Sequence, residues 1–299
     1  MMKSIRTLVR QDREKYVIPR RVQDVIPIQK IWEDGIFLTG GRYAKTFRFT
    51  DINYQVASEP DKEKMFRGYS ALINSLDCGA TTKITIFNHK MSQINFEKSI
   101  LMPMQWDGLD DYREEYNQML LDKATNGNGI VQEKFLTVSV RKKDVDAARS
   151  FFARVEADLS SHFAALGSTC GSMNAIGRLQ ILHRFYRRGE ENEFRFSLRD
   201  SARKGHSFRD YICPDSIERH SDYLQIGDRF ARVLYLKDYA SYIQDDFVSE
   251  LTDLNRDMML SIDMVPIPTD EAVREVENRL LGVETNITNW QRRQNSNSK

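Results

Sequence analysis

The sequence predicts an α+β protein in which antiparallel β-hairpins are joined through helices, with helices covering one face of each mixed or antiparallel sheet. Two observations predict this class. Glycine turns between alternating apolar strands mark two hairpins, one at Gly40-Gly-Arg-Tyr-Ala-Lys45 and one at Gly227-Asp-Arg-Phe-Ala-Arg232. Segments with apolar residues at helical spacing follow each hairpin.

The first half of the chain contains clear start and stop signals. Gly40 and Gly41 tolerate the positive φ of a tight turn, Pro60 begins a helix, and Gly167 ends another. The predicted elements are strands at 35–39 and 43–49, a helix from Pro60 to near Gly79, a strand at 82–87, a helix near 109–124, a strand at 134–140, and helices at 145–166 and 174–188.

The second half repeats the opening. The two glycine motifs differ by an offset of 187 at every position. The predicted order of hairpin, helix, strand and helix also occurs twice, so we expect two duplicated units. The second unit contains predicted strands at 223–226 and 229–236, a helix near 246–254, a strand at 259–265 and a helix after Pro268.

These elements divide the chain into four regions. Residues 1–21 form a basic arm, which we expect to be mobile. Residues 22–200 form an α+β region with the first repeat unit, and residues 201–268 form the second repeat unit. Residues 269–299 form an amphipathic helix and a polar tail.

The leading arm is basic. Residues 1–30 hold eight Lys or Arg residues and three acidic ones, whereas the whole chain carries a net charge of only +1. Such an arm can touch anionic lipid or nucleic acid, or it can be a solvated terminus without a ligand. The candidate contacts to an anionic surface are Lys3, Arg6, Arg10, Arg13, Arg20 and Arg21.

The last helix has an apolar seam. Its apolar residues recur at spacings of three and four, as on the contact face of a packed helix. They are Val273, Val276, Leu280, Val283, Ile287 and Trp290. We expect the early turns to pack on this chain's own sheet, and Val283, Ile287 and Trp290 to remain exposed as a partner interface.

The sequence indicates a cytoplasmic protein. No apolar run reaches the length of a membrane span, and the N-terminus lacks the core of a signal peptide, so any membrane association is expected to be peripheral. Cys78, Cys170 and Cys213 are odd in number and form no paired motif, which is typical of a reducing compartment.

Catalytic motifs were not found in the sequence. None of the 15 glycines is followed by Lys, so the sequence contains no phosphate-binding P-loop. Lys45 is followed by Thr46, as the P-loop lysine is followed by Ser or Thr, but it is preceded by Ala44 instead of Gly. His206, Cys213 and His220 lie at intervals of seven, outside the usual zinc spacings. We therefore predict no catalytic, cofactor-binding or metal-binding residue, and a chain that is not an enzyme by itself.

Several long stretches resemble one family, the VirB-type (CagE/TrbE/VirB) conjugation ATPases of Gram-positive conjugative elements, whose genes lie on mobile genetic elements. Arg209-Asp-Tyr-Ile-Cys-Pro-Asp215 is one of them, and the similarity covers roughly residues 22–294. The stretches are residues 22–28, 45–54, 111–123, 209–215, 251–263 and 266–294.

The resemblance implies a part of a hexameric motor at the cytoplasmic base of a type IV secretion channel for conjugal DNA transfer. It implies an N-terminal domain that docks on channel proteins, while ATP and magnesium bind in a C-terminal domain that has no counterpart here. The partners it implies are channel proteins at the inner face of the membrane, a separate ATPase half, or further copies of the chain. The alternatives of a split subunit, a truncated chain and a decayed copy stay open.

Two rival functions remain. The first is an autonomous nucleic-acid-binding module that uses the basic arm, which would show strong salt dependence of binding. The second is an enzyme whose site no motif reveals, which would show a pocket with perturbed titratable groups.

Overall fold

The computed structural model describes residues 19–52, 54, 56–76, 79–90, 101–126, 130–238 and 246–297. The chain divides into two compact units, and each unit is formed by two segments that are separated in the sequence. One unit combines Met1–Gln29 with Ile176–Ser241, and the other combines Lys30–Ala175 with Tyr242–Lys299. These divisions differ from the linear boundaries at 200 and 268 that the sequence suggested.

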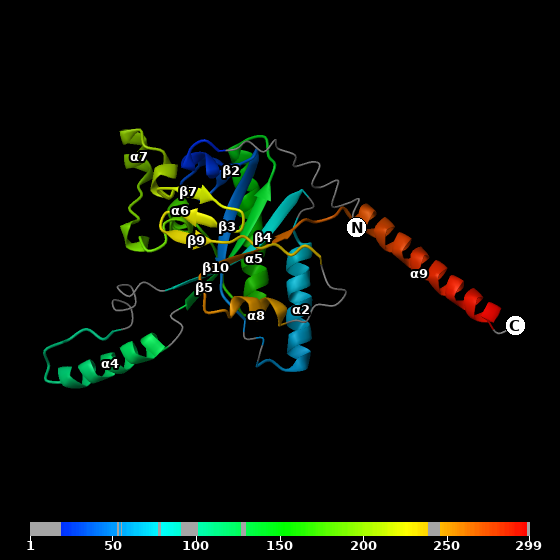
Figure 1. The fold of residues 1–299 in the computed structure, drawn as a ribbon, viewed down its shortest axis with the longest axis horizontal. Coiled ribbons are helices and arrows are strands. Elements are labelled where there is room, and N and C mark those ends of the chain that lie inside the picture. Colours follow the sequence, from blue (N-terminus) through cyan, green and yellow to red (C-terminus); the bar gives the residue numbers. More distant parts are fainter. Residues whose placement is uncertain are drawn as a thin grey trace. The chain divides into compact units, whose positions relative to one another are not determined.

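The main sheet has seven strands in the order β1-β2-β3-β5-β4-β10, with β6 paired to β3 (Figure 1). The pairs β2–β3, β3–β5, β5–β4 and β4–β10 are all antiparallel. The strands are β1 Ile28–Ile31, β2 Phe37–Thr39, β3 Arg42–Phe49, β4 Ala80–Lys90, β5 Ile130–Val140, β6 Cys170–Ser172 and β10 Met258–Met264.

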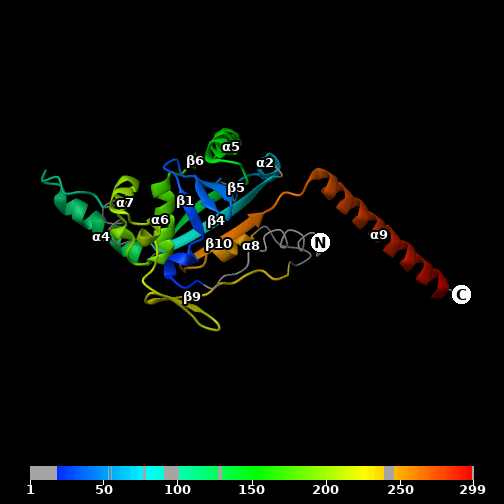
Figure 2. The same ribbon diagram turned by 90° about the horizontal axis from the view of Figure 1, so that it is seen from above.

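Two helices, α2 (Glu59–Asn74) and α5 (Val145–Ala165), pack side by side on one face of this sheet (Figure 2). Local signals define α5: the Asp144 side chain accepts a hydrogen bond from the Ala147 amide at its start, and Gly167 follows its end with a φ of 77°. The predicted positions of both helices are confirmed.

The core of the larger unit lies between these helices and the sheet. Alternate residues of β5 face the apolar side of α5, because side chains alternate between the two faces of a strand. The buried residues of this cluster are Ile36, Phe47, Leu72, Ala80, Leu136, Val138, Val140, Ala148, Phe151, Phe152, Val155, Leu159 and Phe163.

Among the described residues, three further helices belong to the larger unit. The short helix α8 (Phe247–Thr252) is tied to the sheet because the amides of Asn88 and Gln132 both donate to the Thr252 carbonyl oxygen. Helix α4 (Asp110–Asn126) follows β4 in the chain, and α9 (Thr269–Asn297) follows β10.

The smaller unit is built from short elements joined by specific hydrogen bonds. Arg209 donates to the Ile28 carbonyl at 2.6 Å, and Arg187 donates to the Cys213 carbonyl at 2.7 Å. Its elements are η1 Val22–Val25, α6 Ala175–Tyr186, η2 Glu191–Glu193, α7 Leu198–Lys204, η3 Phe208–Tyr211, and a second sheet of β7 Ile217–Arg219, β8 Leu224–Ile226 and β9 Arg229–Ala231.

Both predicted glycine turns are present, and they differ in geometry. Gly40 and Gly41 both have positive φ, whereas in the second turn only Gly227 does. Two positive φ values are typical of a type I′ turn, and one at the first position is typical of type II′. The matching sequence motifs therefore form different turns.

The expectation of two duplicated units is not supported by the strand order. Hairpin, helix and strand do recur, as β2–β3, α2, β4 and then β8–β9, α8, β10. However, the first hairpin shares a sheet with β4, whereas the second hairpin lies in the three-stranded sheet and β10 lies at the edge of the main sheet. The predicted strand at 229–236 is also wrong in length, because β9 ends at Ala231.

The helices and sheets together make the protein α+β, as predicted. Within the described residues, none of the helices is both long enough and apolar enough to cross a membrane.

Candidate functional site

The apolar seam of α9 is exposed along its described length. The exposed fractions are 50% for Val273, 57% for Val276, 58% for Leu280, 55% for Val283 and 51% for Ile287. Val283 and Ile287 are exposed, but they are no more exposed than the early residues, so the predicted difference between the early and late turns is absent. The prediction that the early turns pack on the sheet is wrong.

The path of the chain explains why the early turns are exposed. Helix α9 follows β10, an edge strand, after a connection that contains Pro266 and Pro268. Val265 and Ile267 each precede a proline, which favours an extended backbone at those positions, and residues 265–268 form neither a turn nor a helix. Ion pairs between residues four apart, Arg274 with Asp270 and Arg279 with Glu275, stabilise the helix itself. The side chain of Trp290 lies outside the described part of the structure.

The basic arm lies mostly outside the described residues. Lys3, Arg6, Arg10 and Arg13 belong to the part that is not described, while Arg20 and Arg21 are exposed. The two described arginines are therefore accessible to an anionic surface.

Lys45, the residue that resembles a P-loop lysine, has a structural role. It lies in β3, and its Nζ pairs with Glu156 of α5 at 3.1 Å, while Ser172 of β6 donates to the same carboxylate at 2.6 Å. Burial would raise the pKa of Glu156, but the bonds from Ser172 and Lys45 hold it below its ordinary value. Lys45 thus ties helix to sheet.

The suspected metal residues are not gathered into a site. Among the residues that the structure covers, no three His, Cys, Asp or Glu side chains are grouped to hold a metal ion. His206 and His220 are exposed, whereas Cys213 is buried. His183 is buried, with its ring 5.1 Å from that of Phe194. Burial, and then the nearby Arg187, lower its pKa.

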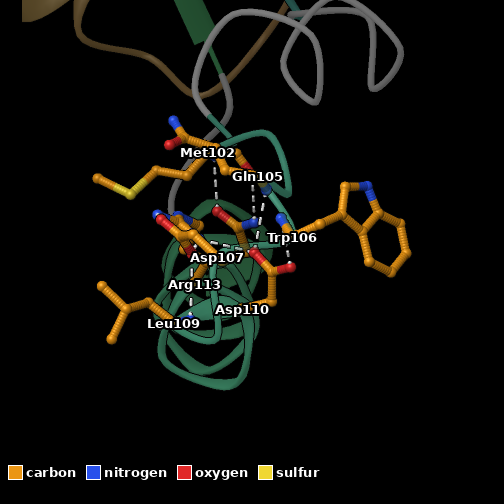
Figure 3. A network of polar contacts seen from close by, with 8 residues as sticks. Met102, Gln105, Trp106, Asp107, Leu109, Asp110 and Arg113 are labelled. Atoms are coloured by element: carbon orange, nitrogen blue, oxygen red, sulfur yellow. Dashed lines mark hydrogen bonds and ion pairs between the residues drawn. The ribbon is translucent and has the colours of Figure 1, made fainter.

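A surface that the sequence reasoning missed lies at the start of α4. Trp106 is 90% exposed, and it has a φ of 58°, the only positive φ among the described non-glycine residues. This left-handed conformation is unfavourable for a residue with a Cβ, at a cost of roughly 1–2 kcal/mol. Figure 3 shows its indole pointing away from the helix. An exposed, strained tryptophan calls for a structural cause.

The cause is a network that clamps the loop onto the helix (Figure 3). The Asp110 carboxylate accepts from the amides of Gln105 at 3.0 Å and Trp106 at 2.9 Å. Arg113 donates to both carboxylate oxygens of Asp107, at 2.5 and 2.6 Å, and to Asp110 at 2.7 Å. The Asp110 contacts fix the backbone on either side of the Gln105–Trp106 peptide bond.

The same network perturbs its charged groups. The bond from Arg113, and then the amide of Leu109, lower the pKa of Asp107 to about 2. The amide of Gln105 is the main cause that lowers the pKa of Asp110. Further along the helix, Asn117 accepts from the Met102 amide at 2.8 Å and donates to the Met102 carbonyl at 2.9 Å, so the beginning of the loop is held as well.

An apolar seam continues from this loop along α4. Leu109, Tyr112, Tyr116 and Met119 are spaced by three, four and three residues, and they are 53%, 71%, 42% and 41% exposed. The sequence held two signals for this surface, namely that spacing and the acids Asp107 and Asp110 before an arginine. Neither signal predicts that the loop is closed, because closure depends on the positive φ of Trp106.

A second apolar segment missed by the sequence reasoning follows β9. Val233, Leu234 and Tyr235 are 77%, 82% and 81% exposed, and Phe230 is 71% exposed. The sequence predicted all four residues as part of one strand, but the ladder with β8 ends at Ala231, so Phe230 lies in β9 and Val233, Leu234 and Tyr235 lie beyond it.

Comparison with known proteins gave no relative, since no protein-family model matches this chain and no curated protein matches it.

Proposed function

We propose that this chain is a non-catalytic docking component of a type IV secretion ATPase, acting through protein contacts in conjugal DNA transfer. The proposal combines the resemblance of residues 22–294 to conjugation ATPases with the surface of α9. In this role the chain works at the cytoplasmic face of the membrane, peripherally attached to channel proteins, while ATP hydrolysis is performed by a separate ATPase half.

The observation that carries the proposal is the exposed seam of α9. Five branched or aliphatic side chains, each at least half exposed, lie on one stripe over four turns. Contiguous exposed apolar stripes mark interaction sites more often than isolated apolar residues do. The two ion pairs of α9 join residues four apart, so each slightly favours the helical conformation and reduces the entropic cost of ordering the helix on binding.

The test is a binding measurement with a defined probe, a separately expressed RecA-like polypeptide with Walker A and Walker B motifs from the same mobile element. The full chain is compared with a variant that carries Val283→Asp and Ile287→Asp. We expect the variant to bind at least tenfold more weakly, because two charges would be buried in an apolar contact.

A matched control is Phe66→Asp, which places a charge on α2 at a side chain that is 67% exposed. This control should bind as the unmodified chain does. Equal binding by the α9 variant and the control would show that the seam is not the docking surface.

A further inference from the structure

The surface at the start of α4 has the chemistry of a binding site for a cationic polypeptide. Trp106 is held with its indole outward, and Tyr112, at 71% exposed, extends the aromatic surface onto the helix. Tryptophan and tyrosine are enriched among the residues that contribute most to protein interfaces. Hydrogen bonds already fix the backbone that carries Trp106, so the loop does not have to be ordered on binding.

The charge of this surface restricts its partner. Residues 101–126 contain six carboxylates and only two basic side chains. Asp107 and Asp110 are engaged with Arg113, while Asp111, Glu114 and Glu115 are exposed on the helix. A partner that covers the aromatic side chains must bring Lys or Arg to these carboxylates, since burying unpaired charges is costly.

The negative charge of this surface also argues against a membrane as the partner. Exposed Trp and Tyr side chains suit the lipid headgroup region, but cell membranes carry anionic lipid on their cytoplasmic side. A surface with this excess of carboxylates is repelled there. A cationic polypeptide satisfies both the aromatic and the acidic groups, because arginine stacks on aromatic faces and pairs with carboxylates.

The chain itself contains a segment of this kind. Residues 1–21 hold seven basic and two acidic side chains, together with the apolar residues Ile5, Leu8 and Val9. We propose that the Trp106 surface of one copy binds the basic segment 1–21 of a second copy. Trp106 and Tyr112 are 90% and 71% exposed, so this surface is accessible to a second copy.

This contact is head-to-tail, since each copy offers one basic segment and one acidic aromatic surface. Repetition of a heterologous contact produces a ring or a filament. The inference rests on α4 and the arm alone, so it stands apart from the function proposed for α9.

The test uses two full-length variants that each lose one side of the contact. Trp106→Ala with Tyr112→Ala removes the aromatic surface, and Arg6→Glu with Arg10→Glu and Arg13→Glu reverses the arm. In sedimentation velocity at about 50 mM salt, where charges are weakly screened, the unmodified chain should self-associate. Each variant alone should self-associate at least tenfold more weakly than the unmodified chain. The control Phe66→Ala should self-associate as strongly as the unmodified chain.

Mixing the two variants decides the proposal. The arm of the first and the aromatic surface of the second are intact, so an equimolar mixture should form a one-to-one complex. Raising the salt to about 500 mM should dissociate it, because ion pairs between exposed groups are screened. Circular dichroism melts of each variant establish that the fold is kept. If the aromatic variant does not fold, Asp111→Asn with Glu114→Gln and Glu115→Gln replaces it.

The absence of a complex in the mixture, or self-association that persists in both variants, would overturn the proposal. An arm variant that loses binding to phosphatidylserine vesicles, while its self-association equals that of the unmodified chain, would also overturn it and assign the arm to lipid.

Discussion

Two glycines with similar backbone conformations, Gly35 and Gly41, differ in the space available for a side chain. Gly35 and Gly41 have similar φ values, 81° and 71°, which L-residues rarely adopt. They differ in surroundings. A Cβ at Gly35 would lie 1.9 Å from the Met173 carbonyl oxygen, whereas a Cβ at Gly41 would meet nothing within 4 Å.

We therefore expect Gly35→Ala to lower the free energy of unfolding by on the order of 3 kcal/mol or more, because backbone must move. Gly41→Ala, the matched control, should lower it by about 1 kcal/mol, the cost of the positive φ alone. Urea unfolding of both variants measures the difference. Equal losses would show that the contact with Met173 relaxes freely.

The clamp at Trp106 should depend on pH. The pKa of Asp107 is about 2 in the folded chain, below its usual 3.8, because Arg113 and the Leu109 amide stabilise the carboxylate. A lowered folded pKa means that the clamp is fully stabilised above pH 3.8 and is weakened as the pH falls toward 2.

The measurement is the fluorescence anisotropy of Trp106 in a chain with Trp32→Phe and Trp290→Phe. The anisotropy should be constant from pH 7 to about 4 and should fall between about 4 and 2 as the loop is released. Asp110 also has a lowered pKa and accepts from the Gln105 and Trp106 amides, so the control removes both acids. In Asp107→Asn with Asp110→Asn the transition should be absent. The same transition in that variant would mean that another group holds the loop.

At the scale of elements, the predictions succeeded where the signals were local. Helix α5 was placed correctly because its cap, its apolar spacing and its terminating Gly167 all lie within the segment. The segments that failed depend on distant partners. Val233, Leu234 and Tyr235 form an apolar run of the kind found in strands, but a strand needs a neighbour, and the ladder of β8 and β9 stops at Ala231. The prediction that the early turns of α9 pack on the sheet is wrong for the same reason. Periodicity shows that one face of a helix is apolar, but it does not show what covers that face.

This contrast gives a prediction about stability. Phe152 in α5 is 1% exposed, so Phe152→Ala should lower the free energy of unfolding by about 3–5 kcal/mol. The α9 variant with Val283→Asp and Ile287→Asp should lower it by about 1 kcal/mol or less, because both side chains are already exposed. Thermal melts compare them. A large loss in the α9 variant would place the distal helix in this chain's own core.

At the scale of the whole molecule, the sequence could not show how the chain is divided. A boundary read along a sequence assigns each stretch to one domain, whereas here the chain passes between the two units three times, at Gln29, Ala175 and Ser241. The α+β class was predictable because it depends on which elements exist. The division was not, because it depends on which elements touch.

The whole chain is expected to have no ATPase activity of its own, since it contains no glycine followed by lysine to bind phosphate. Lys45→Ala should not change the rate of phosphate release. It should lower the free energy of unfolding by about 1–2 kcal/mol, through loss of the pair with Glu156. Phosphate release with magnesium and ATP, beside urea unfolding, separates the two effects. Turnover by a clean preparation that is lost in Lys45→Ala would assign Lys45 a catalytic role.

The attachment of α9 to β10 has a mechanical consequence. A partner bound to α9 would transmit any pull through Pro266 and Pro268 to β10, whose seven residues from Met258 to Met264 pair with β4. A load directed along the strand shears all the ladder hydrogen bonds at once, whereas a load across the strand opens them one after another. Tension along β10 is therefore resisted by the whole ladder, and the sheet edge can serve as a strong anchor point for a partner that moves.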